Sequence, residues 1–165
     1  MMLTNKSTLK LDKRVMEESN LATVAAIERN ANLFPWTLKN FSDCLTAGHQ
    51  SWVYYDENDV LVGFTIVQKV VDELHLLNLC VKKEQQGKGI GKLILKSVVD
   101  YAGVIDAAMI LLEVRQSNTR AQQLYVQSGF NEMAVRKDYY PAQQGREDAI
   151  LMAMTLTLES FLTEY

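Results

Sequence analysis

Three glycines at alternate positions, Gly87, Gly89 and Gly91, are the first residues of this sequence whose spacing suggests chemistry. They separate an apolar run that predicts a buried strand from an amphipathic run that predicts a helix. Glycine lets the backbone approach a ligand and turn several N–H groups toward it, and the first turn of the helix adds its positive dipole end. The turn therefore suits an anion, with phosphate or pyrophosphate as the natural ligand.

Two familiar glycine-rich motifs fail to match this turn. A P-loop needs Ser or Thr after its Gly-Lys pair, whereas Gly91-Lys92 is followed by Leu93. A dinucleotide fingerprint needs the spacing Gly-x-Gly-x-x-Gly with an acidic residue at the end of the next strand, which here ends in Glu113-Val114-Arg115. Residues 86–91, Gln-Gly-Lys-Gly-Ile-Gly, match Gln/Arg-x-x-Gly-x-Gly/Ala instead. Taken alone, this hexamer is equally compatible with a purely structural turn.

A second candidate group lies downstream, at the end of the next predicted strand and in the helix that follows. Glu113 ends the strand, Asn118 begins the helix and Tyr125 lies within it. Each residue also has an ordinary structural explanation. Glu113 could be a surface charge or an ion-pair partner, Asn118 a helix cap, and Tyr125 a core aromatic with a locally bonded hydroxyl. The residue types alone leave these alternatives open.

Composition narrows the class of protein. The length suits a single domain spanning residues 1–165, and a hydrophobic fraction of 48% is enough for an ordinary core. A formal net charge of -3, from 17 basic and 20 acidic residues, gives no sign of the strongly basic surface that binds nucleic acid. The acidic balance could favour a basic peptide substrate, although ordinary solubility is the simpler explanation.

The sequence gives little sign of a metal site, a disulfide or a membrane segment. Cys44 and Cys80 are far apart in sequence, and His49 and His75 are isolated, so we expect no disulfide and no metal site. The N-terminus lacks the apolar core of a signal peptide, and no apolar run approaches transmembrane length. We therefore expect a cytoplasmic protein without a membrane segment.

The elements that must hold the candidate residues follow a mixed α/β order. Residues 1–8 resemble a loose polar tail, and residues 157–165 form an extension that could continue the last strand or form a short amphipathic helix. A strand, helix, strand crossover predicts a parallel pair, 74–81 beside 108–114, within an otherwise antiparallel sheet. The other predicted strands are 9–16, 50–55, 60–70, 130–137 and 148–156, and the predicted helices are 19–31, 37–45, 89–102 and 117–128. Caps are expected at Ser19 or Asn20, at Thr37, and at Ser117 or Asn118.

Together the two candidate groups resemble the GNAT superfamily of N-acetyltransferases. In that superfamily the glycine turn binds the pyrophosphate of acetyl-CoA, and Asn-x-x-Ala-x-x-Leu-Tyr-x-x-x-Gly-Phe follows the next strand. The chain matches this pattern at Asn118, Ala121, Leu124, Tyr125, Gly129 and Phe130. The resemblance implies a single mixed, mostly antiparallel sheet with flanking helices, whose central parallel strands splay apart to form a slot.

A narrower resemblance, over nearly the whole chain, is to the bacterial RimI family, whose members acetylate the N-terminal alanine of protein eighteen of the small ribosomal subunit. It rests on Phe34-Pro35-Trp36, Leu112-Glu113-Val114-Arg115, Arg136-Lys137-Asp138-Tyr139-Tyr140-Pro141 and Gly145-Arg146-Glu147-Asp148-Ala149. The chain departs from that family at Gly87, where arginine is frequent, and at Cys80, where alanine is usual. Lys88 and Lys92 could supply the positive charge that an arginine at position 87 would bring to a phosphate.

The resemblance implies direct transfer of an acetyl group from acetyl-CoA to an amine. Glu113 would take a proton from the incoming ammonium, directly or through a water, and Tyr125 would protonate the departing CoA thiolate. That order is sensible because a thiol has a pKa of about 8.5 and tyrosine one of about 10. Cys80 is the rival nucleophile, for a route through an acetyl-enzyme. Acetyl-CoA would be held by Leu79, Cys80, Val81, Gly87, Lys88, Gly89, Ile90, Gly91, Lys92 and Asn118.

For the acceptor, Phe34-Pro35-Trp36 and Tyr139-Tyr140-Pro141 look like two loops that could form the walls of a peptide groove. Trp36 and Tyr139 are the expected contacts, although Trp36 could equally be a hydrophobic staple or a core plug at the helix junction. The expected partner is the N-terminal peptide of a ribosomal protein, without direct nucleic-acid binding, and the protein is expected to be a monomer or weak dimer. Another peptide, a lysine side chain or a small-molecule amine are alternative acceptors. A non-catalytic acyl-CoA sensor or a ribosome-binding adaptor is a further alternative, and the presence of Glu113 and Tyr125 argues against such an adaptor.

Overall fold

The computed structural model describes residues 8–157 and has a mixed α/β fold. The strands are β1 (Asp12–Val15), β2 (Gln50–Tyr55), β3 (Leu61–Val70), β4 (Glu73–Val81), β5 (Met109–Arg115), β6 (Asn131–Pro141) and β7 (Arg146–Thr155). The helices are η1 (Glu18–Asn20), α1 (Leu21–Ala31), α2 (Leu38–Thr46), η2 (Lys83–Gln85), α3 (Ile90–Val104) and α4 (Thr119–Gln127). The predictions about residues 1–7 and 158–165, within the N-terminal tail and the C-terminal extension, lie outside the described residues.

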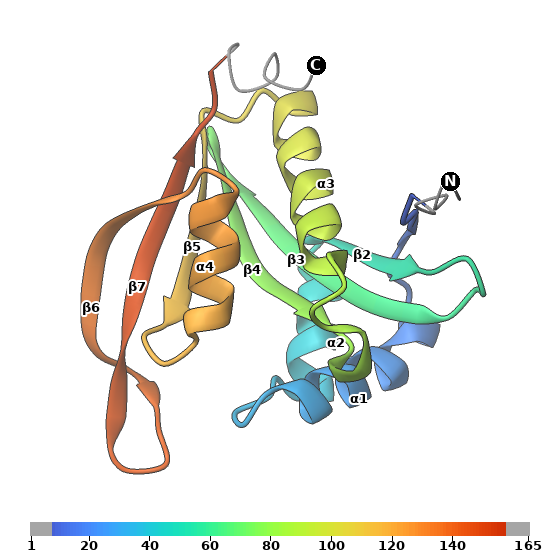
Figure 1. Cartoon of the computed structure of the whole chain (residues 1–165), viewed down its shortest axis with the longest axis horizontal. Coiled ribbons are helices and arrows are strands. Elements are labelled where there is room, and N and C mark those ends of the chain that lie inside the picture. Colours follow the sequence, from blue (N-terminus) through green and yellow to red (C-terminus); the bar gives the residue numbers. More distant parts are fainter. Residues whose placement is uncertain (1–7, 158–165) are drawn as a thin grey trace, which may run out of the picture.

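The strands of the described part form one seven-stranded sheet in the order β1-β2-β3-β4-β5-β7-β6 (Figure 1). Neighbouring strands are antiparallel except β4 and β5, which are parallel. Helix α3 makes the crossover between them, as a parallel pair requires. The predicted sheet, mostly antiparallel with one central parallel pair, is therefore confirmed.

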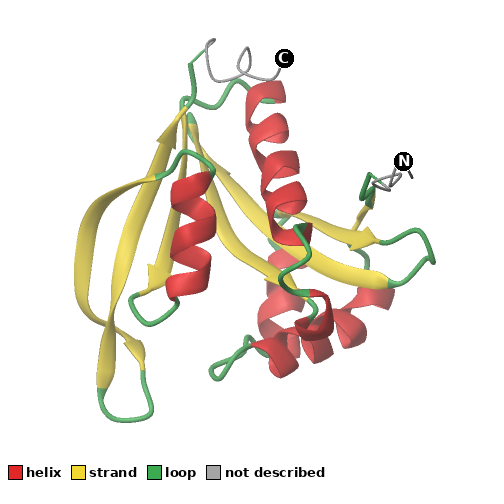
Figure 2. Cartoon of the chain, viewed as in Figure 1, coloured by secondary structure: helices red, strands yellow, loops and turns green. Residues whose placement is uncertain are grey.

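Helices cover both faces of the sheet (Figure 2). Helices α3 and α4 pack over a core that includes Leu74 and Ile110, whereas α1 and α2 pack over a second core that includes Phe41 and Phe64. Gly63 of β3 lets α3 lie close to the sheet, because a Cβ there would come within 2.7 Å of the α3 side chain above it. None of the helices within residues 8–157 combines the length and apolar character needed to cross a membrane. The two helical layers fix β4 and β5 in place.

Strands β4 and β5 separate toward their C-terminal ends (Figure 1). Their pairing ends at Leu76 and Leu112, although both strands continue beyond these residues. On its other edge, the register of β4 with β3 shifts opposite Ile66 and Val67, which marks a bulge. A bulge bends its strand, so it helps to turn β4 away from β5. The remainder of β4 therefore leaves one backbone edge without a strand partner in the described part of the chain.

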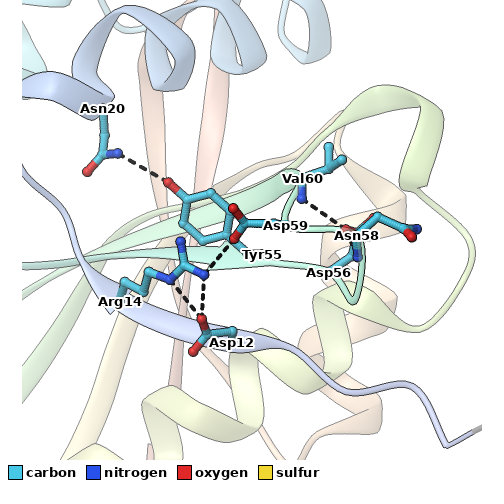
Figure 3. Close-up of polar contacts among 8 residues, drawn as sticks. All are labelled: Asp12, Arg14, Asn20, Tyr55, Asp56, Asn58, Asp59 and Val60. Atoms are coloured by element: carbon cyan, nitrogen blue, oxygen red, sulfur yellow. Dashed lines mark hydrogen bonds and ion pairs between the residues drawn. The ribbon is translucent and has the colours of Figure 1, made fainter.

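Edge strand β1 is attached to the sheet by polar contacts as well as by its pairing with β2. The guanidinium of Arg14 donates to Asp12 at 2.7 Å and to Asp59 at 2.6 Å, and Asp59 lies in the turn between β2 and β3 (Figure 3). These groups are exposed, so their ion pairs contribute little to the free energy of folding. The contacts nevertheless hold the edge of the sheet that is farther from the parallel pair.

Two local predictions were wrong. The side-chain cap expected for the first helix is absent, because Asn20 precedes α1 but its Oδ1 accepts from the backbone N–H of Glu17. The segment Tyr139-Tyr140-Pro141 belongs to strand β6 rather than to a loop, since pairing with β7 resumes there after a register shift. Proline is tolerated at this place because β6 is an edge strand. The expected caps at Thr37 and Asn118 are confirmed.

Candidate active site

A cavity of about 850 Å³ opens where β4 and β5 separate. Its lining comes from both strands, from the end of α1 and the loop that leads to α2, from α4 and the loop before it, and from the end of β6 and the start of β7. Five predicted site residues lie in this lining: Trp36, Leu79, Glu113, Asn118 and Tyr125. The fold thus brings the expected catalytic pair together with residues of the expected donor and acceptor sites.

The glycine turn has the backbone geometry predicted for anion binding. Gly87 and Gly89 have φ angles of 79° and 86°, a region that favours glycine, and Gly89 is the N-cap of α3. A Cβ on Gly89 would meet no atom within 4 Å, so the space beside the start of the helix is open. Gln86 fixes the turn by donating from Nε2 to the Val81 carbonyl at 3.0 Å. These features fit a phosphate at the first N–H groups of α3.

A cation from another element lies against this turn. Arg120, in the first turn of α4, donates from Nη1 to Oε1 of Gln86 at 3.2 Å. Its Nη2 lies 3.1 Å from the point where a Cβ of Gly87 would be. Arg120 therefore places a positive charge beside Gly87. The family that the sequence resembles frequently has arginine at that position.

The last residues of β4 offer backbone groups along an unpaired edge. Leu79, Cys80 and Val81 pair with β3 on one side and with no strand of the described part on the other, and Leu79 lines the cavity. The Cys80 side chain is buried, and this burial, with the nearby Glu28 carboxylate, raises the pKa of its thiol. A thiol that keeps its proton is a poor nucleophile, so the environment of Cys80 favours direct transfer over an acetyl-enzyme route.

Glu113 extends from β5 and is held by two residues of β6. Its Oε1 lies 3.2 Å from Nε of Arg136. A hydrogen bond with Glu113 raises the pKa of the Tyr139 phenol. The Glu113 side chain is 25% exposed, so an incoming amine can reach its carboxylate. The ion-pair explanation for Glu113 is therefore correct, and its contacts with Arg136 and Tyr139 hold the carboxylate at the cavity; a catalytic role stays a prediction.

Tyr125 combines a core position with an available hydroxyl. It packs on Phe130, with ring centroids 5.6 Å apart, and is 7% exposed. Within residues 8–157 its hydroxyl forms no hydrogen bond, although the residue lines the cavity. Burial raises the pKa of this phenol, so the proton stays on the oxygen at ordinary pH. Tyr125 can therefore donate a hydrogen bond to a group bound in the cavity.

Asn118 has a clear structural role at the start of α4. Its Oδ1 accepts from the backbone N–H of Ala121 at 3.1 Å, which is a helix cap. The residue also lines the cavity. The cap explanation is confirmed, and contact with the CoA arm stays a prediction.

Arg115 links the two predicted acceptor walls. Its Cζ lies 4.7 Å from the ring centroid of Phe34 and 4.4 Å from that of Tyr140. Its Nη1 donates to the Pro141 carbonyl at 2.7 Å and to Oε1 of Glu147 at 2.8 Å. Burial raises the pKa of Tyr140 to about 12. One guanidinium therefore ties the loop before α2 to the end of β6.

The two residues expected to contact the acceptor, Trp36 and Tyr139, differ in their position relative to the cavity. Trp36 lines the cavity and also packs its ring on Phe41, with centroids 5.4 Å apart, so the plug and the acceptor explanations both remain open. Of the adjacent tyrosines, Tyr140 lines the cavity, whereas Tyr139 is 41% exposed and contacts Glu113. In a regular strand only one of two adjacent tyrosines would face the cavity, which favoured Tyr139, but the register shift before Tyr140 breaks this alternation. Acceptor binding by Trp36 and Tyr139 stays a prediction, to which the structure adds Tyr140.

Sequence reasoning left Glu28, Asn78, Arg115 and Glu147 out of the candidate site, although all four line the cavity. Glu28 had a signal in the sequence, since it occupies the buried face of a helix where an apolar residue is expected. Residues 8–157 contain no group of three or more His, Cys, Asp or Glu arranged to hold a metal.

Comparisons with known proteins point to the same chemistry. The model of the acetyltransferase (GNAT) family matches residues 16–130. The [ribosomal protein bS18]-alanine N-acetyltransferase of Escherichia coli K12 is 37% identical over 147 residues, which cover 87% of this chain and 96% of the relative. The crystal structure of the ribosomal-protein-S18-alanine N-acetyltransferase from Escherichia coli matches with a TM-score of 0.83 and 34% identity, covering 90% of this chain and 96% of that one. A spermidine N-acetyltransferase chimera from Vibrio cholerae and hSSAT, with 17% identity, a TM-score of 0.80 and coverage of 93% and 99%, shares the fold alone.

Proposed function

This chain belongs to the GNAT family of acetyltransferases, and from that premise we propose that it acetylates the N-terminal alanine of ribosomal protein bS18. The acetyl donor is acetyl-CoA, which family membership implies. The main support for the proposal is the cavity between β4 and β5. Glu113, Tyr125 and the loop with Phe34-Pro35-Trp36 all line it. The relatives whose names state this activity match nearly the whole chain.

The donor side of the cavity suits acetyl-CoA. Residues 87–92 bind the pyrophosphate through the backbone N–H groups at the start of α3. The unpaired edge of Leu79, Cys80 and Val81 binds the pantetheine arm in the manner of an added strand. The N–H of Leu79 or Val81 polarises the thioester carbonyl. The donor is thereby held with its acetyl group between the separated strands.

Transfer forms a C–N bond and breaks a C–S bond. The nitrogen loses two protons on the way from ammonium to amide, the departing thiolate gains one, and the other is released to solvent. An α-ammonium has a pKa of about 8, so roughly one-tenth is free amine at pH 7. Glu113 accepts the proton of the remaining ammonium, directly or through a water, and the amine then attacks the thioester carbonyl. Tyr125 donates to the departing thiolate, whose thiol has a pKa near 8.5, and the phenolate then recovers the second proton, which the new amide nitrogen loses. The two side chains therefore have opposite roles for a physical reason, since one is a partly exposed carboxylate and the other a buried phenol.

The proposal is tested by mixing the protein with acetyl-CoA and a synthetic peptide copied from the alanine-bearing N-terminus of bS18. Intact mass and fragment spectra then show whether one acetyl group is added and where. A second peptide carries the same sequence with a blocked N-terminus and an added lysine. Acetylation of the free α-amine alone supports the proposal. Acetylation of the lysine peptide, or of neither peptide by a protein that binds acetyl-CoA, contradicts it and points to another acceptor amine.

Replacing Arg120 with alanine is expected to raise KM for acetyl-CoA about tenfold, with kcat changed less than about twofold. The reason is the position of its guanidinium beside Gly87 and Gln86, where it adds a charged donor for phosphate. The measurement is a steady-state titration of acetyl-CoA at saturating peptide. Arg29→Ala, which removes an exposed arginine of α1, is the matched control and should leave KM unchanged. An equal KM for Arg120→Ala and the control would remove Arg120 from the donor site.

Replacing Arg115 with lysine is expected to raise KM for the bS18 peptide about tenfold while KM for acetyl-CoA stays within about twofold. A lysine ammonium cannot lie between two rings and donate in a fixed fork, so the loop with Phe34 and the strand with Tyr140 lose their common anchor. The measurement is a peptide titration at saturating acetyl-CoA, with a thermal melt to check folding. A parallel rise of both KM values would mean general loss of structure and contradict a role at the acceptor walls.

Several expectations from the sequence stay predictions. These are a single domain over residues 1–165, a monomer or weak dimer, a cytoplasmic location and the lack of direct nucleic-acid binding. Size-exclusion chromatography with light scattering, over a range of protein concentrations, measures the oligomeric state. A dimer that persists at nanomolar concentration would contradict the expected weak association.

A further inference from the structure

Three glutamates line the cavity, and two of them are paired with arginine. Glu113 has the guanidinium of Arg136 at 3.2 Å, and Glu147 has that of Arg115 at 2.8 Å. Within residues 8–157 no lysine, arginine or histidine forms an ion pair with the third, Glu28. The cavity therefore contains one carboxylate without a positive partner in the described part of the protein.

Glu28 is surrounded by neutral hydrogen-bond donors. Its Oε1 accepts from the backbone N–H of Trp36 at 3.1 Å, and its Oε2 accepts from Nδ2 of Asn78 at 3.4 Å. The Asn32 and Cys80 side chains also act to lower the pKa of the Glu28 carboxyl. Trp36 and Asn78 both donate to the carboxylate, which favours its charged form. These donors therefore stabilise the charged form of Glu28 in part.

Burial acts in the opposite direction. The residue is 3% exposed, and this burial raises the pKa of the Glu28 carboxyl. A buried charge is costly unless a partner of opposite sign compensates it, and neutral donors compensate it only in part. A cation that enters the cavity would compensate the remaining negative charge of Glu28. The acceptor of the proposed reaction carries such a cation, since most of its α-amine is protonated near neutral pH.

The position of Glu28 places this charge on the acceptor side. Glu28 holds the backbone of Trp36, in the loop that forms one acceptor wall, and it contacts Asn78 on the strand that binds the donor. Both neighbours line the same cavity as Glu28 and Glu113. An ammonium drawn to Glu28 is therefore held in the space that Glu113 also lines.

We propose that Glu28 is the residue that binds the α-ammonium of the acceptor peptide before Glu113 removes its proton. This inference rests on the proposed function, because it assumes that the acceptor is the N-terminal amine of a peptide. It assigns separate tasks to the two carboxylates. Glu28 selects a free, positively charged N-terminus, and Glu113, already paired with Arg136, receives the proton.

The test is binding of two peptides in the presence of CoA, which cannot react. One is the bS18 peptide with a free N-terminus, and the other is the same peptide already acetylated, and calorimetry gives both dissociation constants. Glu28→Gln keeps the volume and removes the charge, so it should weaken binding of the free peptide about tenfold and that of the acetylated peptide less than about twofold. Glu28→Asp keeps the charge and shortens the reach, so it should retain a preference for the free N-terminus.

The outcomes separate this inference from the proposed function. If the wild type neither binds nor acetylates the free peptide, the proposed function fails. If the wild type does both, but Glu28→Gln weakens both peptides equally, Glu28 is only a support for the loop and the inference is overturned. The inference would also be overturned if Glu28→Gln and Glu28→Asp weakened binding of the free peptide by the same factor. The charge at position 28 would then not determine the affinity for the free N-terminus.

A measurement on the wild type keeps the inference testable if Glu28→Gln does not fold. The carboxyl carbon of Glu28 is followed by NMR across a pH titration, with CoA and either peptide bound. A nearby ammonium should lower the pKa of Glu28 in the complex with the free peptide, compared with the complex with the acetylated one. The groups facing Glu28 are Asn32, Trp36, Asn78 and Cys80, and the raised pKa of the Cys80 thiol keeps it neutral over this range. An identical Glu28 pKa in the two complexes would overturn the inference.

Discussion

Replacing Glu113 with glutamine is expected to lower kcat/KM for the acceptor peptide about 100-fold at pH 7. The substitution keeps the size of the side chain but removes the proton acceptor from the cavity lining. If Glu113 did no more than deprotonate the ammonium before the attack, the loss at pH 7 could not exceed about tenfold, because about one-tenth of the amine is already free. A larger loss therefore means that the carboxylate also accepts the proton during the attack itself.

The pH dependence of Glu113→Gln follows from the titration of the acceptor amine. Above pH 9 more than about nine-tenths of the α-amine is free. Most of the peptide therefore reaches the variant already as the reactive free amine. The ratio of wild-type to variant rates should narrow from about 100-fold at pH 7 to about tenfold at pH 9. The measurement is kcat/KM for the peptide at intervals from about pH 6 to about pH 9.5, a range that spans the amine pKa. Glu132→Gln, an exposed glutamate of β6, is the matched control and should show no loss at any pH. A ratio that stays constant across the range would exclude removal of the ammonium proton by Glu113.

Replacing Tyr125 with phenylalanine is expected to lower kcat about 100-fold while KM for acetyl-CoA changes little. The ring remains packed on Phe130, so the free energy of unfolding should stay near that of the wild type. The variant lacks the hydroxyl, which has no hydrogen-bond partner within residues 8–157 and is therefore available to the departing thiolate. The measurement is release of free CoA thiol under saturating conditions, together with a thermal melt.

The raised pKa of Tyr125 also predicts the shape of the pH profile. A phenol whose pKa is raised by burial stays protonated throughout the assay range, so Tyr125 should produce no fall in activity on the alkaline side. The pH profile of Tyr125→Phe should therefore be parallel to that of the wild type, only lower. Tyr101→Phe, which removes a hydroxyl from a ring packed on Trp52, is the matched control. Wild-type turnover by Tyr125→Phe would exclude Tyr125 as the acid.

The fold could be predicted because its signals are local. The crossover from 74–81 through a helix to 108–114 required a parallel pair, and hydrophobic alternation located the other strands to within a few residues. The error at Tyr139-Tyr140-Pro141 has a physical cause. Proline and adjacent aromatics suggest a loop, whereas the resumed pairing of Tyr140 with Glu147 is a tertiary contact that no local pattern encodes.

The candidate site could be predicted in part. The glycine turn, Glu113 and Tyr125 belong to sequence patterns, and the fold puts both side chains in one cavity. The roles of Arg120 and Arg115 could not be predicted from sequence, because each depends on an element distant in the chain. Glu28 was visible only as a polar residue on an apolar helix face, and its significance came from knowing which partners surround it.

The register shift in β6 has a consequence for the behaviour of the protein in concentrated solution. An edge strand presents unpaired N–H and C=O groups, and a long regular one is a template for aggregation. Strand β6 is such an edge, and most of its residues are exposed, but the shift between Arg136 and Tyr140 interrupts its ladder and Lys137 and Asp138 add charge there. The same irregularity carries Arg136 and Tyr139 to Glu113. Straightening this strand to gain stability would therefore disturb the contacts that hold the Glu113 carboxylate and expose the molecule to edge-to-edge association.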